Sequence, residues 1–188
     1  GTAGAAHAPA WPVLMLHGFG ADGTIWQPLE SALDHALGAG HGHEMLRIDL
    51  PGHGRSPRRR IAGFAALARA VVEAVDAADC APVHLVGHSL GGAVALALAD
   101  IRPRAIATLT LIAPAGLGPE IDGEVLAGLG RARRAASLAP WLRRMVGDGA
   151  LISDDYARAA MRGRAGAELR AVQADMAEAL FPDGVQGF

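Results

Sequence analysis

The sequence predicts an α/β fold with a parallel sheet, helices on both faces and a helical cap. Short apolar runs alternate with helical segments as far as residue 112, and only helical segments follow residue 119. This alternation favours right-handed crossover connections, which give a parallel sheet. The 188 residues suit one domain, so we expect a core over 1–118 and a cap region of the same domain over 119–188.

Four short apolar runs are predicted to form the strands. They are 12–16 (PVLML), 44–49 (EMLRID), 83–87 (VHLVG) and 105–112 (AIATLTLI). Such nearly continuous apolar runs are typical of strands buried on both faces, as in a parallel sheet. Pro51 and Gly52 end the second run with a turn signal.

The helices of the core are predicted at 24–37, 62–78 and 90–101. In the first of them Thr24 can cap the helix, and a leucine or isoleucine recurs every four residues from Ile25 to Leu37. The cap is predicted to contain helices at 123–136, 138–146, 154–161 and 167–180. Because no convincing strand follows residue 119, the cap is an addition to the sheet and not its continuation.

The composition excludes several classes of protein. A hydrophobic content of 51% with 19% charged residues is that of a globular chain. The net charge of −2 gives no general attraction to nucleic acid or to an anionic membrane. The most apolar stretch, 90–99, is far shorter than the ~20 residues that span a bilayer. Residues 1–10 do not have the features of a secretory signal. We therefore expect a cytoplasmic protein.

The turn after the third predicted strand carries the strongest functional signal. Gly87, Ser89 and Gly91 form a Gly-x-Ser-x-Gly pattern between a strand and a helix, which is typical of a nucleophile elbow. The glycines leave room around the serine, and the helix that follows directs free amides and a positive dipole end toward a developing oxyanion. We therefore expect Ser89 to be a catalytic nucleophile.

Two other interpretations of this turn are less favoured. The serine could simply cap the helix in a glycine-rich connection. The turn could also be a dinucleotide-binding fingerprint, but Ser89 occupies the place of the second glycine. In addition, the next strand ends in Ile112 and Ala113 without the acidic residue that binds a ribose.

A second loop follows the first predicted strand and begins His17-Gly18-Phe19. The amide of Phe19 is expected to join the amide of Leu90 as an oxyanion hole. The remaining residues expected at the elbow and its pocket are His17, Gly18, Gly87, His88 and Gly91.

The segment 49–56 (DLPGHGRS), together with the His-Gly loop and the elbow, resembles the α/β-hydrolase family, whose members carry these motifs in this order. The later segments 113–121 (APAGLGPEI) and 179–184 (ALFPDG) look like the acyltransferase (E2) component of acetoin dehydrogenase complexes. The resemblance implies hydrolysis of a small-molecule ester or thioester, or transfer of its acyl group, through an acyl-enzyme on the serine. It also implies coenzyme A or lipoyl thioesters as substrates, with no bound cofactor. The cap would then cover the pocket, and its Leu, Met and Ala content suggests an apolar lining.

The general base expected for this family is missing from the sequence. All eight histidines precede Ser89, whereas the family places its histidine after the serine and the acid. Asp122, Asp148 and Asp183 follow the serine but none ends a recognisable strand. We therefore expect a fragment of a longer protein that lacks the histidine of the triad and is weakly active or inactive by itself.

Family strand order would leave the second and fourth strands as sheet edges, and exposed edges invite pairing with another chain. Self-association or a companion segment is thus expected. Two other functions stay open: a non-catalytic scaffold or binding domain, and an acid-base enzyme such as a lyase or haloperoxidase on the same fold.

The remaining polar features give weaker signals. The arginines at 58–60, 131–134 and 143–144 could meet coenzyme A phosphates but are typical of solvated helix faces. His41 and His43 are expected in an exposed loop, and Cys80 as an ordinary thiol that cannot form a disulfide within the chain. No metal site is predicted.

Overall fold

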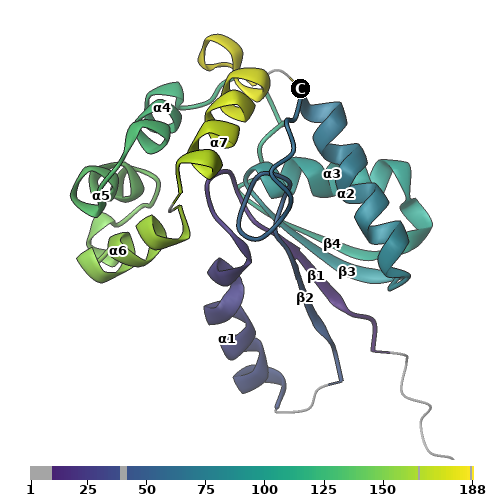
Figure 1. The fold of residues 1–188 in the computed structure, drawn as a ribbon. Coiled ribbons are helices and arrows are strands. Elements are labelled where there is room, and N and C mark those ends of the chain that lie inside the picture. Colours follow the sequence, from purple (N-terminus) through teal and green to yellow (C-terminus); the bar gives the residue numbers. More distant parts are fainter. Residues whose placement is uncertain (1–9, 39–41, 165, 187) are drawn as a thin grey trace, which may run out of the picture.

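The fold centres on a four-stranded parallel sheet with the strand order β2-β1-β3-β4 (Figure 1). The computed structural model describes residues 10–38, 42–164, 166–186 and 188. The strands are β1 (Val13–Leu16), β2 (Met45–Ile48), β3 (Val83–His88) and β4 (Ile106–Ile112). All four predicted strands are confirmed, as is the position of the second and fourth at the edges; pairing through those edges stays a prediction.

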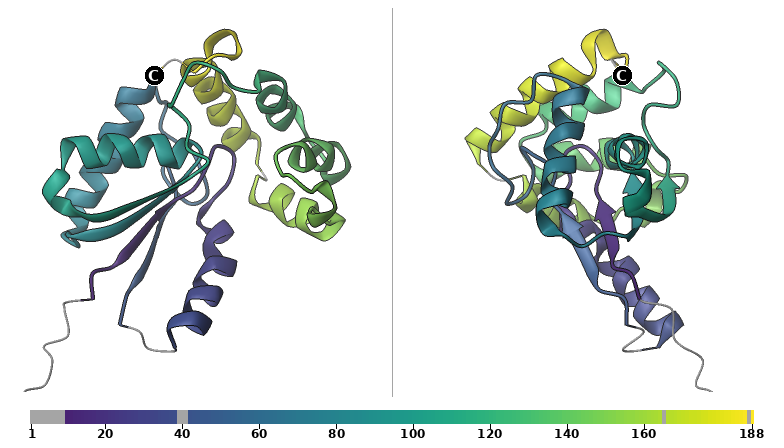
Figure 2. Two further views of the ribbon diagram at one scale, coloured as in Figure 1. Left: turned by 180° about the vertical axis from the view of Figure 1, so that it is seen from behind. Right: turned by 90° about the vertical axis from the view of Figure 1, so that its right-hand side faces the viewer.

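Helices cover both faces of the sheet, as predicted (Figures 1 and 2). They are α1 (Gln27–Leu37) on one face and α2 (Phe64–Ala78) and α3 (Leu90–Ile101) on the other. On the first face Arg47 of β2 pairs with Glu30 of α1 at 3.2 Å. On the other face Leu85 of β3 packs in one apolar cluster with residues of α2 and α3.

The first helix begins differently from the prediction. A 3₁₀ turn, Gly23–Trp26, precedes α1, and Asp22 rather than Thr24 caps it, because the Asp22 carboxylate accepts a hydrogen bond from the Thr24 amide. Pro28 then lies in the first turn of α1, where its missing N–H costs nothing.

The region after residue 119 is helical, as predicted. Its helices are α4 (Gly123–Arg131), α5 (Ala135–Arg144), α6 (Asp154–Gly163) and α7 (Ala167–Leu180). The predicted helix over 123–136 ends at Arg131 because Arg134 is extended, with a φ of −140°, and starts α5 with a cap completed by Ser137. The boundaries of α7 agree with the prediction.

The cap is held by two separate apolar clusters. Met176 and Leu180 of α7 are buried in the main core at the carboxyl end of the sheet. A smaller cluster holds α4 and α5 together through Val125, Leu129 and Leu138. Figure 1 accordingly shows α7 over the core and α4 to α6 as a lobe beside it.

The glycines of the elbow permit unusually close contact between backbones. A Cβ atom at Gly91 would lie 2.3 Å from the carbonyl oxygen of Leu16, and one at Gly87 would lie 2.6 Å from the carbonyl oxygen of Gly91. Side chains at either position would push α3 away from β1 and β3. The same contact fixes the first turn of α3 against the end of the central strand.

We predict that Gly91→Ala destabilises the fold by about 3 kcal/mol or more, because the added methyl meets rigid backbone. Gly130→Ala is the matched control: it lies in α4, and a Cβ there meets no atom within 4 Å. This variant should gain about 0.5–1 kcal/mol from helix propensity. Urea unfolding of both variants tests the prediction, and equal stabilities would contradict it.

Candidate active site

Ser89 lies at the junction of β3 and α3 with a strained backbone. Its φ of 51° and ψ of −120° are values that non-glycine residues rarely adopt, at a cost of about 1–3 kcal/mol. The strain is held by hydrogen bonds, because the Ser89 carbonyl accepts from the amides of Gly92 at 2.8 Å and Ala115 at 2.9 Å, and the Ser89 amide donates to Ile112 at 3.1 Å. This is the sharp strand-to-helix turn predicted from the sequence.

The loop after β1 lies directly against this serine. A Cβ at Gly18 would lie only 3.0 Å from both Ser89 Cβ and His88 Nδ1, so the loop and the elbow are in tight contact here. The structure thus brings together the predicted residues Gly18, His88 and Ser89. Among the described residues, neither the Phe19 amide nor the Leu90 amide donates to any acceptor, which leaves two N–H donors next to the serine.

The side chain of Phe19 fixes this loop from the other side. Its ring is buried and meets His53 edge-on, with ring centroids 5.5 Å apart. It also meets Phe181, just after α7, edge-on at 5.8 Å. Phe181 in turn approaches Phe188, which stacks on Phe64 of α2 at 4.3 Å.

Two buried histidines join the loop after β1 to the loop after β2. His17 Nε2 accepts from the Leu50 amide at 2.9 Å, and its Nδ1 lies 2.8 Å from the Gly18 carbonyl. His53 Nε2 accepts from the Gly20 amide at 2.9 Å, and its Nδ1 lies 3.1 Å from the Pro51 carbonyl. Each ring therefore accepts at one nitrogen and donates at the other, as only a neutral imidazole can.

Burial keeps both rings uncharged. Desolvation lowers the pKa of His17, and desolvation together with the neighbouring His17 lowers the pKa of His53 to about 3. Both nitrogens of His17 are already bonded, so His17 positions the loop and is not available as a base for Ser89.

Asp49, the first residue of the 49–56 motif, organises the second loop. Its carboxylate accepts from the amides of Gly23 at 2.7 Å and Arg55 at 2.8 Å. Burial acts to raise the pKa of Asp49, but these amide donors hold it below its usual value. The motif is thus a structural brace between the loop after β2 and the start of α1.

His88 stands nearest to Ser89 among the histidines. Its Nδ1 is buried without a hydrogen-bond partner, and burial lowers its pKa. It makes no hydrogen bond to Ser89, and over the described ranges no other imidazole does so either.

Two of the candidate acids have structural roles in the cap. Asp122 caps α4 by accepting from the Val125 amide and pairs with Arg144 at 3.0 Å. Asp148 caps a 3₁₀ turn by accepting from the Ala150 amide. The side chain of Asp183 lies outside the described part of the structure.

A cavity of about 560 Å³ opens between the elbow and the α4 to α6 lobe. Ser89, His88 and the 18–22 loop form its floor, and the lobe forms its walls. The apolar walls are Leu129, Leu138, Leu142 and Met145. The volume is in the range of small-molecule sites, and the predicted apolar lining by the cap is present.

One charged residue of this cavity, Arg164, was not among the candidates from the sequence. It follows α6 and is only 6% exposed. As one of seventeen basic residues it carried no signal. A buried cation is visible only after the chain has folded.

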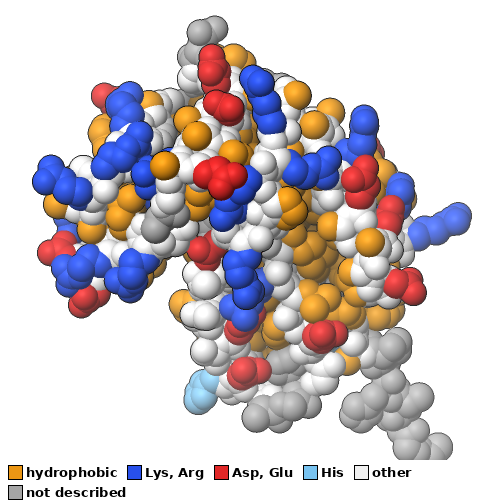
Figure 3. Space-filling view, viewed as in Figure 1, with side chains coloured by type: hydrophobic (Ala, Val, Ile, Leu, Met, Phe, Trp, Pro, Cys, Tyr) orange, Lys and Arg blue, Asp and Glu red, His pale blue; other side chains and the backbone are white. Residues whose placement is uncertain are grey.

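The other arginines of the cap behave as surface residues. Figure 3 shows basic side chains interspersed with acidic ones over the α4 to α6 lobe. Arg144 pairs with Glu124 at 2.6 Å, and Arg143 pairs with Asp154 at 3.0 Å.

Three other residues were singled out in the sequence. His43 is bonded to the Trp11 carbonyl, and Cys80 is a half-buried free thiol. His41 lies outside the described residues.

A nucleophile elbow above a parallel sheet, faced by a glycine loop and covered by helices, defines a class of α/β enzymes. The profile described as the alpha/beta hydrolase family matches residues 13–186. The chain therefore belongs to the α/β-hydrolase family, as its motifs indicated. No helix within the described ranges has the length and apolar character needed to cross a membrane.

Among characterised relatives, the chain is 37% identical over 143 residues to the dihydrolipoyllysine-residue acetyltransferase component of the acetoin cleaving system of Pseudomonas putida. That match covers 76% of this chain and 37% of the relative, so the chain spans under half of that protein. A putative carbamate hydrolase, RutD, of Variovorax paradoxus is 42% identical over 110 residues, covering 56% of this chain and 40% of the relative. The predicted likeness to acetoin-system acyltransferases is confirmed.

Solved structures agree on the fold. The 2-hydroxy-6-oxo-6-phenylhexa-2,4-dienoate hydrolase of a Rhodococcus species superposes with a TM-score of 0.75 at 21% identity, covering 93% of this chain and 66% of that one. An esterase from Exiguobacterium antarcticum gives a TM-score of 0.63 at 18% identity, covering 88% of this chain and 64% of that one.

We predict that Ser89→Gly is more stable than Ser89→Ala by about 1 kcal/mol, because glycine adopts the backbone angles of the elbow without strain. Both variants lose the hydroxyl, so the comparison isolates the backbone. Guanidinium unfolding measures the difference. If Ser89→Gly were the less stable of the two, the strain at this turn would be disproved.

We also predict that stability falls as the pH drops below about 6.5. The folded pKa of His53, about 3, lies below the usual 6.5, so the unfolded chain takes up its proton first. The contribution of neutral His53 to the free energy of unfolding is therefore fully present above pH 6.5. It is lost progressively toward pH 3, by about 1.4 kcal/mol per pH unit for such a group.

The variant His53→Gln, which keeps an acceptor for the Gly20 amide, should show a shallower loss between pH 6.5 and 4. His35→Asn, on the exposed surface of α1, is the control and should keep the full loss. Unfolding free energies at several pH values test this. An unchanged slope in His53→Gln would refute the assignment.

Proposed function

We propose that this protein is a serine-nucleophile acyl hydrolase or acyltransferase that acts on an ester or thioester through an acyl-enzyme. The observation that carries the proposal is Ser89, held in a strained elbow beside two unbonded amide N–H groups and open to an apolar cavity. These are the parts that acyl transfer requires: a nucleophile, oxyanion donors and an acyl pocket.

In the proposed reaction the Ser89 hydroxyl oxygen bonds to the acyl carbon, and the amides of Phe19 and Leu90 stabilise the oxyanion. The alcohol or thiol then leaves with a proton, which gives the acyl-enzyme. Water or an acceptor thiol next attacks the acyl carbon and restores the Ser89 hydroxyl. Coenzyme A or a lipoyl group fits the role of the thiol, and the acetyltransferase named among the relatives supports this choice.

The proton of Ser89 needs an acceptor, and no imidazole of the described residues is bonded to the serine. We therefore expect the 188-residue chain by itself to be a slow enzyme. It should accelerate the reaction only roughly 10³- to 10⁴-fold over the rate in water. The same observation favours one second candidate, a non-catalytic domain that retains the pocket for binding.

A fluorophosphonate probe distinguishes the two candidates, because it bonds covalently to an activated serine. With the full-length natural protein we expect one adduct, at Ser89, by intact mass and peptide mapping. Ser89→Ala should abolish the adduct. Ser31→Ala removes an exposed hydroxyl of α1 and should leave the adduct unchanged. A folded protein that stays unlabelled, or is labelled at another serine, would favour the binding domain.

A further inference from the structure

Arg164 is a buried cation in the wall of the cavity. It follows the last turn of α6, and only 6% of its surface is exposed. Burial of a guanidinium is costly unless its charge is paired and its N–H groups are bonded. The partners of Arg164 therefore show whether its charge is satisfied within the fold.

The fold provides few hydrogen-bond acceptors for the N–H groups of this side chain. One terminal nitrogen, Nη2, donates to the Leu129 carbonyl at 2.6 Å, while Nε is buried without a partner. Across the described ranges, no carboxylate lies within ion-pair distance of Arg164. Asp22, the one acid among the described residues that line the cavity, accepts from the Thr24 amide and hydroxyl through Oδ1 and forms no ion pair with Arg164.

The guanidinium lies next to the loop that faces the serine. A Cβ at Gly20 would come within 2.8 Å of Arg164 Nη1, so the loop that carries the Phe19 amide passes directly beside this nitrogen. Nη1 makes no hydrogen bond to the described residues. An arginine has five N–H donors, and the two on Nη1 of Arg164 are thus free beside a pocket that Arg164 and Ser89 both line.

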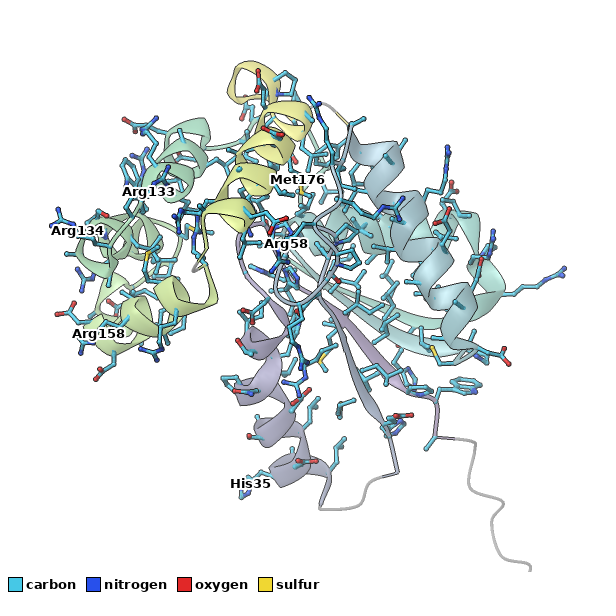
Figure 4. The ribbon with its side chains drawn as sticks, viewed as in Figure 1. His35, Arg58, Arg133, Arg134, Arg158 and Met176 are labelled. Atoms are coloured by element: carbon cyan, nitrogen blue, oxygen red, sulfur yellow. The ribbon has the colours of Figure 1, made fainter. Side chains whose placement is uncertain are left out.

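The surroundings add positive rather than negative charge. Burial lowers the pKa of Arg164, and the nearby Arg133 lowers it further. By contrast, Arg158 of α6 points outward from the lobe, as Figure 4 shows, and pairs with Asp155 at 2.5 Å. Arg143, Arg144 and Arg158 on the cap surface thus have carboxylate partners, whereas the buried Arg164 has none among the described residues.

We propose that Arg164 binds a carboxylate on the acyl group of the substrate, so that the pocket takes esters or thioesters of dicarboxylic or oxocarboxylic acids. This inference rests on the proposed function and names its substrate class. A planar guanidinium can donate two parallel hydrogen bonds to the two oxygens of a carboxylate. The apolar walls Leu129, Leu138 and Leu142 would contact the methylene chain between the carboxylate and the reacting carbonyl.

Binding of glutarate tests the inference without catalysis. By isothermal titration calorimetry, glutarate should bind the wild-type protein about 30-fold more tightly than its neutral diamide, since a buried charged contact is worth about 2 kcal/mol. Arg164→Gln should lose this difference, and Arg158→Gln, in the helix that precedes Arg164, should keep it. Equal binding of the two ligands by the wild type overturns the inference, even if Arg164→Gln fails to fold. Binding of inorganic phosphate in preference to glutarate also overturns it.

Kinetics separate this inference from the proposed function. The full-length protein should cleave mono-p-nitrophenyl glutarate with a higher kcat/KM than p-nitrophenyl butyrate, and Arg164→Gln should reduce that ratio about 30-fold. Cleavage of both esters at Ser89 without a preference would disprove the carboxylate site and keep the hydrolase. Glutarate binding through Arg164 without labelling of Ser89 would support the carboxylate site and disprove the hydrolase.

Discussion

The contact between the start of α3 and the end of β1 is the constraint on which the site depends. Without side chains at Gly87 and Gly91, the helix backbone approaches the carbonyl of Leu16 far more closely than any other residue type allows. The serine is consequently forced out of the sheet at an angle that its own backbone resists. Strain at Ser89 and close packing at the glycines are two aspects of one arrangement.

A second set of interactions keeps the facing loop in register with that serine. The two neutral histidines each use one nitrogen as an acceptor and the other as a donor, and so connect the loop after β1 to the loop after β2. Asp49 extends this connection to the start of α1. Polar groups that look catalytic in a sequence are here a scaffold, because both sides of each imidazole are already occupied.

Much of the fold was predictable because its signals are local. Apolar runs identified each strand of the described residues, and the glycine pattern around Ser89 identified the elbow before any contact was known. The start of α1 and the break near Arg134 were missed because they depend on particular hydrogen bonds, to the Asp22 carboxylate and the Ser137 hydroxyl. No periodicity in the sequence records such bonds.

The site, in turn, was predictable only on its core side, where Ser89 and Gly18 belong to motifs with fixed spacing. The cavity walls come from a lobe whose packing against the core has no short signature, and a charge without a counterion, such as Arg164, can be recognised only when all of its neighbours are known.

The aromatic chain that runs from Phe19 through Phe181 and Phe188 to Phe64 has a consequence for the proposed oxyanion donors. Phe19, whose amide is one of these proposed donors, has its ring held by Phe181, just after α7. Its N–H dipole is thereby oriented in advance, and little reorganisation would be required when negative charge develops beside it. In the proposed reaction, the aromatic residues that follow α7 would thus help to preorganise a dipole in the loop after β1.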